Sequence, residues 1–395
     1  MKILHLATSI SGGAGIAARR ICQAQIEIGM EASLLGGQMN HKSKILKHES
    51  LFEGTQLQQI KSPLVTYLQR QFVQKSDLLT TPVSINIVNP DDEKIQEANV
   101  VNIHAFYNFI SLQAISALAK SHNVVVTLHD QRFFTGGCHY SFDCNQYETL
   151  CNKCPQIQSR TNFIALRTHS QALANQKNLE RVTYIAPSKW LADLAMKSSL
   201  LRNCRVEVIN NPVPSVFHKR TKPDRTNLLT IGFVSENLNN PYKGIKTLVE
   251  AINLVSRDRQ VSLQLFGNGR VSGINPNVKV SYARFEDDEE SVKAYNSCDV
   301  VVIPSLQDNS PSVLAESLMC GIPVIASRVG GISEILSQFG LPVFPPGDFK
   351  ELAQLIENFA LTSPKFTNLE NAHQLFSNKI VANKYQDLYS EFVTP

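Results

Sequence analysis

Residues 304–326 read PSLQDNSPSVLAESLMCGIPVIA, and an apolar run, Val300–Ile303, comes directly before them. The apolar run has the length and composition of a buried strand, and the polar residues after it suit a loop. Ser310 supplies a capping hydroxyl and Pro311 suits the first position of a helix, so a helix is predicted to begin there. A second apolar run, Val324–Ala326, then completes the β–α–β pattern of a parallel sheet.

The same alternation extends along the rest of the chain. Apolar runs predict strands at Lys2–Ala7, Ala32–Leu35, Val100–His104, Val124–His129, Val182–Ala186 and Val206–Ile209, and again at Leu228–Val234, Val261–Phe266, Val278–Tyr282, Val300–Ile303, Val324–Ala326 and Leu341–Phe344. Helical spacing predicts helices at Ala14–Glu27, Ser111–Lys120, Ile164–Asn178, Lys189–Ser198, Gly244–Val255, Asp288–Asn296, Pro311–Met319, Ile332–Leu336 and Phe349–Leu361, with a last one in Asn378–Phe392. The segment Lys42–Pro90 is the least regular and predicts helices or a flap.

The stretch Asn210–Pro214 breaks the alternation with turn and proline residues, and the pattern begins again after it. We therefore predict an α/β fold with two Rossmann-like, doubly wound parallel-sheet domains, residues 1–212 and 213–377, and a C-terminal helix in 378–395 that crosses back to the first domain. Ligands of open α/β sheets bind beyond the carboxyl ends of the strands. Two such edges that face each other predict a central cleft.

The bulk composition suits two well-packed domains. The 395 residues are too many for one compact domain, and 43% hydrophobic and 18% charged residues are values of a folded protein. A net charge of +4 argues against a nucleic-acid-binding protein, which needs a concentrated basic face. The first strand is predicted at Lys2 with no leader before it, and no apolar run reaches about 18 residues. The sequence thus predicts a cytoplasmic protein whose eight cysteines are mostly reduced.

Residues 308–316 have the chemistry of a polar binding site. Free backbone N–H groups at a helix start bind phosphate or sugar oxygens. Glu316 lies about five residues into the predicted helix, roughly 7 Å along its axis. Asp308 and Glu316 can therefore reach different ends of one elongated ligand. The alternative is a capped core helix with a solvated glutamate on its side.

This stretch resembles the acidic-x7-Glu signature of family four retaining glycosyltransferases of the GT-B fold, and the runs Gly321–Ala326 and Gly330–Glu334 are also typical of that family. Asp308 stands where the family usually has glutamate, and Glu316 matches the second acidic position. The resemblance implies that Asp308 contacts donor sugar hydroxyls and that Glu316 binds the ribose of a nucleotide. The donor-binding residues that it implies between them are Asn309, Ser310, Pro311, Ser312, Val313 and Leu314.

A second match to the family is Pro241–Ile245. A lysine just before a helix start can neutralise a diphosphate without a metal, and the resemblance implies this role for Lys243 beside Gly244. The family's other basic residue, which usually follows the glycine at position 232, is missing here or is replaced by Arg328. The alternative for Lys243 is a surface lysine at a turn.

Two further segments resemble the nucleotide-binding part of the family. Gly267 and Asn268 resemble a loop near the nucleotide, and Arg284 and Phe285 match the segment beside the base. In the first half, Gly12 and Gly13 open a helix directly after the first strand, where the family meets donor phosphates or the acceptor. This loop is not a full G-x-G-x-x-G fingerprint, which argues against a nicotinamide dehydrogenase.

His129 ends a predicted strand and matches the family's active-site histidine, which contacts the donor sugar. A buried structural histidine is the alternative, and for His104 a structural and a functional role are equally supported. The resemblance implies catalysis by His129, Lys243, Asp308 and Glu316 without a strong protein nucleophile. The leaving diphosphate would help to deprotonate the acceptor, and positioning and charge stabilisation would supply most of the rate. No Asp-x-Asp motif suggests a metal or other cofactor for transfer.

Four cysteines lie within 17 residues, in the pattern Cys138-x5-Cys144-x6-Cys151-x2-Cys154. The closing Cys-x2-Cys is a common spacing of zinc ligands. The cluster predicts a structural zinc that braces the loop after His129, with unrelated buried thiols or a pair of disulfides as alternatives. A similar cysteine-rich loop occurs in polysaccharide-biosynthesis members of the family.

The resemblance predicts an enzyme, a hexosyl- or related transferase that moves a sugar from a nucleotide-sugar donor to a glycan or lipid-linked acceptor. A sugar-nucleotide epimerase of the same fold and a catalytically silent nucleotide-sugar-binding subunit are the alternatives. Peripheral contact with the inner membrane face is a further hypothesis. It rests on apolar Leu64, Leu68 and Phe72 at helical spacing and on the basic residues Lys61, Arg70, Lys75, Arg160, Arg167, Lys177 and Arg181. Packing of that apolar stripe into the core is the more ordinary alternative.

Overall fold

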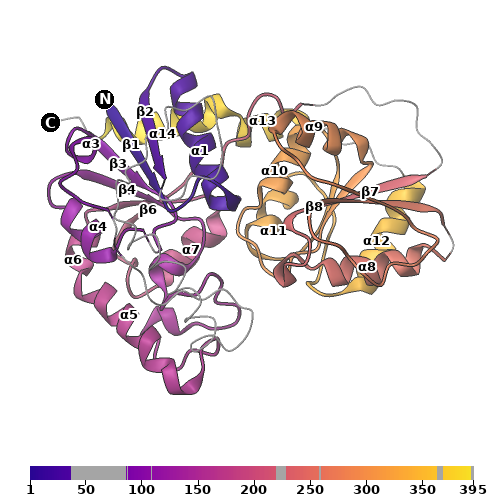
Figure 1. Ribbon diagram of the computed structural model, residues 1–395, viewed down its shortest axis with the longest axis horizontal. Coiled ribbons are helices and arrows are strands. Elements are labelled where there is room, and N and C mark those ends of the chain that lie inside the picture. Colours follow the sequence, from indigo (N-terminus) through magenta and orange to yellow (C-terminus); the bar gives the residue numbers. More distant parts are fainter. Residues whose placement is uncertain are drawn as a thin grey trace. The chain divides into compact units, whose positions relative to one another are not determined.

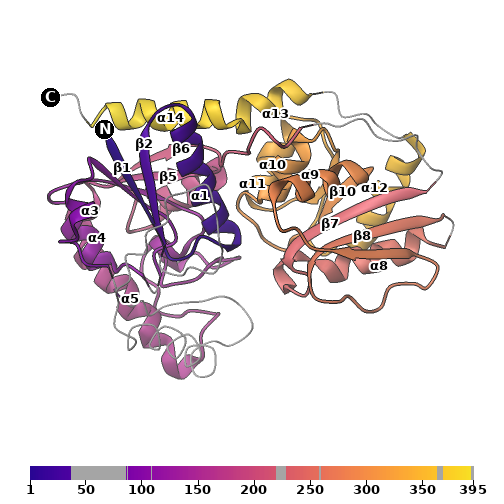
Figure 2. The same ribbon diagram turned by 45° about the horizontal axis from the view of Figure 1, so that its top comes forward.

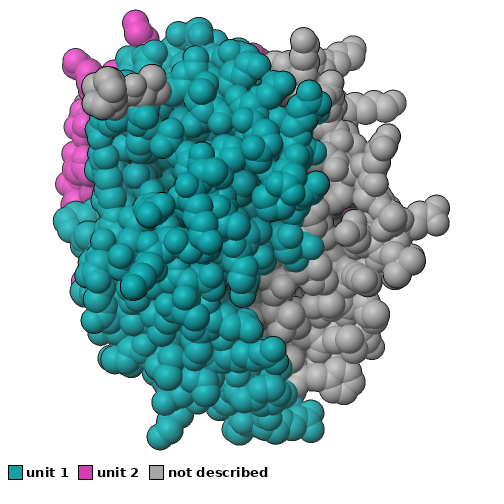
Figure 3. All heavy atoms as spheres, turned by 90° about the vertical axis from the view of Figure 1, so that its left-hand side faces the viewer, with its two compact units in different colours: residues 1–210, 381–395 teal, residues 211–380 magenta. Residues whose placement is uncertain are grey.

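The computed structural model describes residues 1–36, 86, 88–107, 109–218, 228–257, 259–362 and 368–392. The chain divides into two compact units: unit 1 comprises Met1–Asn210 and Val381–Pro395, and unit 2 comprises Asn211–Ile380. Figure 3 colours unit 1 teal and unit 2 magenta. The basic and apolar residues between Lys61 and Lys75 lie outside the described ranges.

Unit 1 contains a parallel sheet in the order β2-β1-β3-β4-β5-β6 (Figure 1). Its strands are β1 (Lys2–Ala7), β2 (Glu31–Gly36), β3 (Val100–Ile103), β4 (Asn123–Thr127), β5 (Thr183–Ala186) and β6 (Arg205–Val208). Its helices are α1 (Gly12–Glu27), α3 (Glu93–Gln96), α4 (Leu112–Leu118), α5 (Asn162–Ala174), α6 (Gln176–Leu179), α7 (Lys189–Lys197) and the short 3-10 turns η1 (Arg132–Phe134), η2 (Gln146–Glu148) and η3 (Ser159–Thr161).

The two faces of this sheet are covered by different parts of the chain. Side chains of successive strand residues point to opposite faces, so Val124 and Val126 of β4 belong to one core cluster and Val125 to another. The second cluster is completed by α14 (Asn378–Ser390), whose Tyr385 and Tyr389 are fully buried. Figure 2 shows α14 beside the strands of unit 1, so the end of the chain supplies part of the first unit's core.

Unit 2 contains a second parallel sheet, in the order β12-β11-β10-β7-β8-β9. Its strands are β7 (Leu229–Asn237), β8 (Val261–Asn268), β9 (Lys279–Ala283), β10 (Val300–Ile303), β11 (Val324–Ser327) and β12 (Val343–Phe344). Its helices are η4 (Pro241–Lys243), α8 (Ile245–Val255), α9 (Asp288–Ser297), α10 (Ser312–Met319), α11 (Gly330–Ser337), α12 (Phe349–Thr362) and α13 (Leu369–Phe376). Residues of β10 alternate between the two cores of this unit, as a strand buried on both faces requires.

The predicted α/β class with parallel sheets is confirmed, and several local predictions are wrong. The helix predicted over Ile164–Asn178 is two helices that meet at Asn175, and α3 and α13 were not predicted. The predicted capping role of Ser310 is also wrong, because α10 begins at Ser312 with Pro311 as its N-cap and has no side-chain cap. Of the segment Lys42–Pro90, only its last few residues fall within the described ranges.

Candidate functional site

The order of the second sheet brings two loops of the predicted site together. Strand β7 lies between β10 and β8, so the connections that leave β7 and β10 diverge at this point of the sheet. Ligands of open α/β sheets bind outside the carboxyl ends of the strands at such switch points. Lys243 follows β7 and Asp308 follows β10, which places both at the expected edge.

Lys243 and Asp308 form an ion pair in which the lysine Nζ lies 2.7 Å from Oδ2 of the aspartate. The hydroxyl of Ser305 donates to the same oxygen at 3.2 Å, and the backbone N–H of Asn309 donates to Oδ1 at 3.0 Å. The Asp308 side chain is 7% exposed and the Lys243 side chain 32%. A buried, hydrogen-bonded carboxylate thus holds an ammonium that still reaches the surface, and an ammonium has three N–H donors.

Gly244 allows the two loops to approach this closely. Its φ is +69°, a conformation that residues with a side chain rarely adopt. A Cβ atom at this position would lie 1.8 Å from the carbonyl oxygen of Pro304. The backbone N–H of Leu306 also donates to the carbonyl of Tyr242 at 2.7 Å. Close packing of the two loops therefore requires glycine at position 244, and Lys243 supplies the charge.

Glu316 lies on α10 and is 8% exposed, so the interpretation of a solvated glutamate is wrong. The hydroxyl of Tyr295, on α9, donates to its Oε2 at 2.5 Å. Hydrogen bonds to an ionised carboxylate are stronger than those between neutral groups. Tyr295 is a further candidate residue that the sequence analysis missed, because it falls within the helical pattern of Asp288–Asn296 and has the spacing of an ordinary core residue.

The start of α10 remains available for a ligand. No side chain caps this helix, and the first N–H groups of a helix have no intrahelical partner. The first two N–H groups of the helix are those of Ser312 and Val313. They fall within the segment that the sequence analysis assigned to the donor, Asn309, Ser310, Pro311, Ser312, Val313 and Leu314. The loop after β10 and the helix start therefore combine a cation, a buried carboxylate and open amide donors.

The predicted nucleotide-side residues divide into two groups. Gly267 has a φ of +143°, and a Cβ there would lie 1.7 Å from the carbonyl oxygen of Ser235, while Asn268 accepts a backbone bond from Leu238 at 2.8 Å. Phe285 packs against Tyr295, with ring centroids 6.5 Å apart, and thus lies near Glu316. Arg284 and Arg328 are exposed, and no hydrogen bond or ion pair connects either side chain to Lys243 in the described part of the chain.

In unit 1 the corresponding switch point lies between β1 and β3. Gly12 and Gly13 are the first residues of α1, and the φ of Gly12 is +70°. A Cβ on Gly15 would lie 2.5 Å from the carbonyl oxygen of Ser9, so this helix start packs tightly against the loop before it. Ser11 is the N-cap residue but its side chain makes no cap bond. No side chain therefore caps the start of α1, and its role in a phosphate or sugar contact stays a prediction.

His129 belongs to a row of three stacked histidines in unit 1. Its Nε2 lies 3.0 Å from Nδ1 of His104, and Nε2 of His104 lies 2.9 Å from Nδ1 of His5. Nε2 of His5 in turn lies 2.9 Å from Oε1 of Gln25. Burial lowers the pKa of His5 and of His129 to about 4, and burial with two imidazole neighbours lowers the pKa of His104 well below its ordinary value. All three rings are therefore neutral near pH 7.

A charged cluster that the sequence analysis missed lies next to His129. Arg132 donates to both carboxylate oxygens of Asp130, at 3.0 and 2.9 Å from Nε, and its guanidinium lies 3.4 Å from the ring centroid of Tyr107. Nδ1 of His139 lies 3.2 Å from Oδ2 of Asp130. Burial raises the pKa of Asp130, but the positive charge of Arg132, together with the contact from His139, outweighs burial and holds the pKa well below its usual range.

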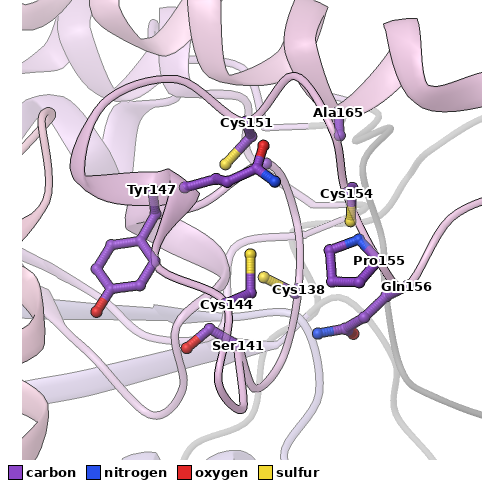
Figure 4. Close-up of a pocket in the computed structure, with 11 residues that line it drawn as sticks. Cys138, Ser141, Cys144, Tyr147, Cys151, Cys154, Pro155, Gln156 and Ala165 are labelled. Carbon is purple, nitrogen blue, oxygen red and sulfur yellow. The ribbon is translucent and has the colours of Figure 1, made fainter.

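The four clustered cysteines surround one pocket (Figure 4). Cys138, Cys144, Cys151 and Cys154 all line it, and its accessible volume of about 10 Å³ holds a single water-sized sphere. All four are free thiols, so they do not form the alternative pair of disulfides. Within the described residues, no group of three or more His, Cys, Asp or Glu is already spaced as metal ligands are. Burial raises the pKa of Cys151 to about 12.

The four described basic residues of the membrane hypothesis, Arg160, Arg167, Lys177 and Arg181, are exposed. They lie on or beside α5 and α6, and Phe163 of α5 is 61% exposed. In the ranges that the structure covers, no helix is long and apolar enough to cross a bilayer.

Comparison with known proteins assigns a family to unit 2. Residues 228–360 match the family described as Glycosyl transferases group 1. The putative colanic acid biosynthesis glycosyl transferase WcaC of Escherichia coli is 26% identical over 315 residues, which are 73% of this chain and 74% of that protein. The D-inositol 3-phosphate glycosyltransferase of Corynebacterium efficiens is 33% identical over 107 residues, 23% of this chain and 25% of that protein.

Solved structures extend the similarity to the whole chain. Sucrose-phosphate synthase from Thermosynechococcus elongatus has a TM-score of 0.65 at 15% identity, with 100% of this chain and 99% of that chain covered. Anabaena HepE in complex with UDP and glucose has a TM-score of 0.64 at 18% identity, with 99% of each chain covered. At these identities the likeness shows the fold, which is the two-sheet GT-B architecture.

Proposed function

We propose that the chain, whose residues 228–360 match the Glycosyl transferases group 1 family, transfers a sugar from a nucleotide-sugar donor to a glycan or lipid-linked acceptor in surface polysaccharide biosynthesis. The observation that carries the proposal is the Lys243–Asp308 pair beside the open start of α10, at the switch point of the second sheet. A cation and helix-start N–H groups together match a diphosphate ester.

In this proposal unit 2 binds the donor and unit 1 binds the acceptor. Glu316, oriented by Tyr295, accepts hydrogen bonds from the ribose hydroxyls, and Phe285 and Arg284 lie beside the base. Lys243 and the N–H groups of α10 hold the diphosphate. Anabaena HepE, which has this fold, binds UDP and UDP-glucose, and a uridine diphosphate sugar is the first donor to test.

The proposed reaction retains the configuration of the sugar and needs no metal for transfer. The bond between the anomeric carbon and the diphosphate oxygen breaks, and the acceptor oxygen bonds to the same face of that carbon. The acceptor proton passes to the leaving diphosphate oxygen. Lys243 stabilises the negative charge that develops on this oxygen, which is the electrostatic contribution that enzymes most often supply. His129 contacts the donor sugar.

A panel of nucleotide-sugars tests the proposal directly. A ligand that binds the folded state raises the melting temperature of the protein, so thermal shift with UDP-, GDP- and ADP-sugars identifies the donor. Incubation of that donor with glycan and lipid-linked acceptors then measures transfer. Binding with epimerised donor as the product would identify an epimerase, and binding without turnover on any acceptor would identify a silent subunit. No binding of any nucleotide-sugar would contradict the proposal.

We also propose that the loop of Cys138–Cys154 holds a structural zinc. The four thiols line a single pocket with room for one small ion, and thiolates are favoured zinc ligands. Because the thiols are not yet at ligand spacing, an ion would have to draw the loop together. It would also have to displace the thiol protons, which burial holds tightly on Cys151 and Cys138. The ion would brace a segment whose regular structure is limited to short 3-10 turns.

A further inference from the structure

A continuous line of buried polar side chains crosses unit 1 and ends at His129. It starts at Tyr389 on α14, continues through Gln25 on α1 and His5 on β1, and reaches His104 at the end of β3. The exposed fractions of Tyr389, Gln25 and His5 are 0%, and that of His104 is 1%. At these exposures bulk solvent does not reach the side chains, so each must find its hydrogen-bond partners inside the unit.

The direction of hydrogen bonding must be the same along the whole line. A neutral imidazole has one N–H donor and one nitrogen acceptor, and burial keeps the pKa of His5 near 4 and that of His104 below its ordinary value. Both ring nitrogens of His5 and of His104 have a partner in the line. Fixing the proton on one ring therefore fixes the protons on the other two.

The side-chain amide of Gln25 decides between the two directions. With Oε1 toward His5, the fully buried Nε2 group of Gln25 makes no hydrogen bond of normal geometry, and its neighbour is the Tyr389 oxygen, which already accepts a bond from Asn102. With the amide turned over, Nε2 donates to His5 and Oε1 faces the Tyr389 hydroxyl, which adjoins Gln25. The identity of amide oxygen and nitrogen is set by the network around them, and buried polar groups are rarely left unpaired.

The other neighbours of Tyr389 favour the turned amide. Thr127 donates its hydroxyl to Oδ1 of Asn102 at 2.9 Å, and Nδ2 of Asn102 donates to the Tyr389 oxygen, also at 2.9 Å. The tyrosine oxygen thus already accepts a bond, and its own proton needs an acceptor. Oε1 of Gln25 is that acceptor when the amide is turned, and both Gln25 groups are then paired.

We propose that Tyr389, Gln25, His5 and His104 form a one-directional hydrogen-bond relay that holds His129 with its proton on Nδ1. Tyr389 donates to Gln25, Gln25 to His5, His5 to His104, and Nδ1–H of His104 to Nε2 of His129. The four relay members are positioning residues, since they act through His129. Their importance for transfer rests on the proposed function of His129. The protonation pattern of the three rings is independent of that function.

The relay can be tested by nitrogen NMR of the full chain with 15N-labelled histidine. Long-range couplings distinguish Nδ1–H from Nε2–H rings, and single histidine-to-glutamine variants assign the signals. We expect His5, His104 and His129 each to give one Nδ1–H pattern at pH 6 to 8. The exposed His218 serves as the reference for a ring that exchanges between both tautomers in water. An Nε2–H pattern at His129 in the wild type would overturn the proposal.

Tyr389→Phe tests the relay at its far end, with Tyr385→Phe as the matched control. Tyr385 lies on the same helix, is equally buried and faces Thr127, but it is outside the line. Without the Tyr389 hydroxyl, Oε1 of the turned Gln25 amide has no donor, and the two amide orientations become similar in energy. His129 should then show a mixture of the two tautomers in Tyr389→Phe and a single tautomer in Tyr385→Phe. If both variants keep a single Nδ1–H pattern, Tyr389 does not set the direction and the relay is refuted.

An activity measurement separates this inference from the proposed function. If His129 contacts the donor sugar, Tyr389→Phe should lower kcat by about three- to tenfold with little change in the donor KM, and Tyr385→Phe should not. The expected NMR pattern without any transferase activity would support the relay and contradict the function. Normal kcat in Tyr389→Phe with altered tautomers would show that the relay does not act in transfer.

Discussion

Lys243 and Asp308 are separated in the sequence by the five elements from α8 to β10, yet they share a hydrogen bond at 2.7 Å. Asp308, which stands where a longer glutamate is usual in the family that the sequence resembles, forms an ion pair with Lys243. Its carboxylate accepts hydrogen bonds from Ser305 and from the Asn309 amide, and it also pairs with the partly exposed ammonium of Lys243. The consequence for chemistry is that the charge of Lys243 is fixed in place before any ligand arrives.

Replacement of Lys243 by glutamine should therefore lower turnover far more than donor binding. The loss of one electrostatic contact to a leaving group is expected to cost about 2–4 kcal/mol, or roughly 30- to 1,000-fold in kcat. Lys246→Gln, which replaces an exposed lysine on α8, is the control for the loss of one positive charge outside the site. Steady-state kinetics with the identified donor make the comparison, and equal kcat values for the two variants would remove Lys243 from the site.

Tyr295→Phe should weaken donor binding without unfolding the protein. The change removes the hydroxyl that holds Glu316, and a hydrogen bond to a charged group contributes about 1.5–3 kcal/mol. We expect the donor Kd to rise at least tenfold, as measured by calorimetry. Tyr282→Phe is the control, because the Tyr282 hydroxyl bonds only to the Val271 backbone among its described contacts. An unchanged Kd in Tyr295→Phe would contradict the ribose-binding role of Glu316.

At the scale of elements, the described loop between η1 and η3 contains one short 3-10 turn, η2, and no helix or strand. If zinc braces it, purified protein should contain close to one zinc per chain by elemental analysis. Cys151→Ser should lower the zinc content and the melting temperature, and a strong chelator should lower the melting temperature of the wild type only.

Cys204→Ser is the matched control, because Cys204 is a partly buried cysteine of unit 1 outside the pocket. Metal-free wild-type protein with four titratable thiols in the loop would refute the zinc site.

The strands and most helices could be predicted because their periods are local properties of the sequence. The alternating burial of Val124, Val125 and Val126 follows directly from such a pattern. The partner of Glu316 could not be predicted in this way, since Tyr295 has the same helical spacing as a core residue and acquires its role only when α9 packs beside α10. His5 is a similar case, because within an apolar strand nothing in the sequence indicates its two histidine neighbours.

At the scale of the whole molecule, the acceptor determines where the enzyme works. The exposed Arg160, Arg167, Lys177 and Arg181 would favour an anionic surface by about 1 kcal/mol each when close to it. We expect sedimentation with anionic but not neutral vesicles at low salt, and release at high salt. The double variant Arg160→Gln/Arg167→Gln should weaken binding to anionic vesicles, and the control Lys246→Gln/Lys350→Gln should leave that binding unchanged. No sedimentation under any condition would make a water-soluble acceptor the better proposal.

The return of α14 to unit 1 has a consequence for how the protein is made. A ribosome synthesises all of unit 2 after β6 and before α14, so for that interval the nascent sheet of unit 1 exposes the face lined by Ile3, Val100, Val125 and Ile185. Exposed apolar surface on a growing chain is prone to aggregation. Unit 2 can thus complete its core during translation, whereas unit 1 reaches its final packing only when Tyr385 and Tyr389 have left the exit tunnel.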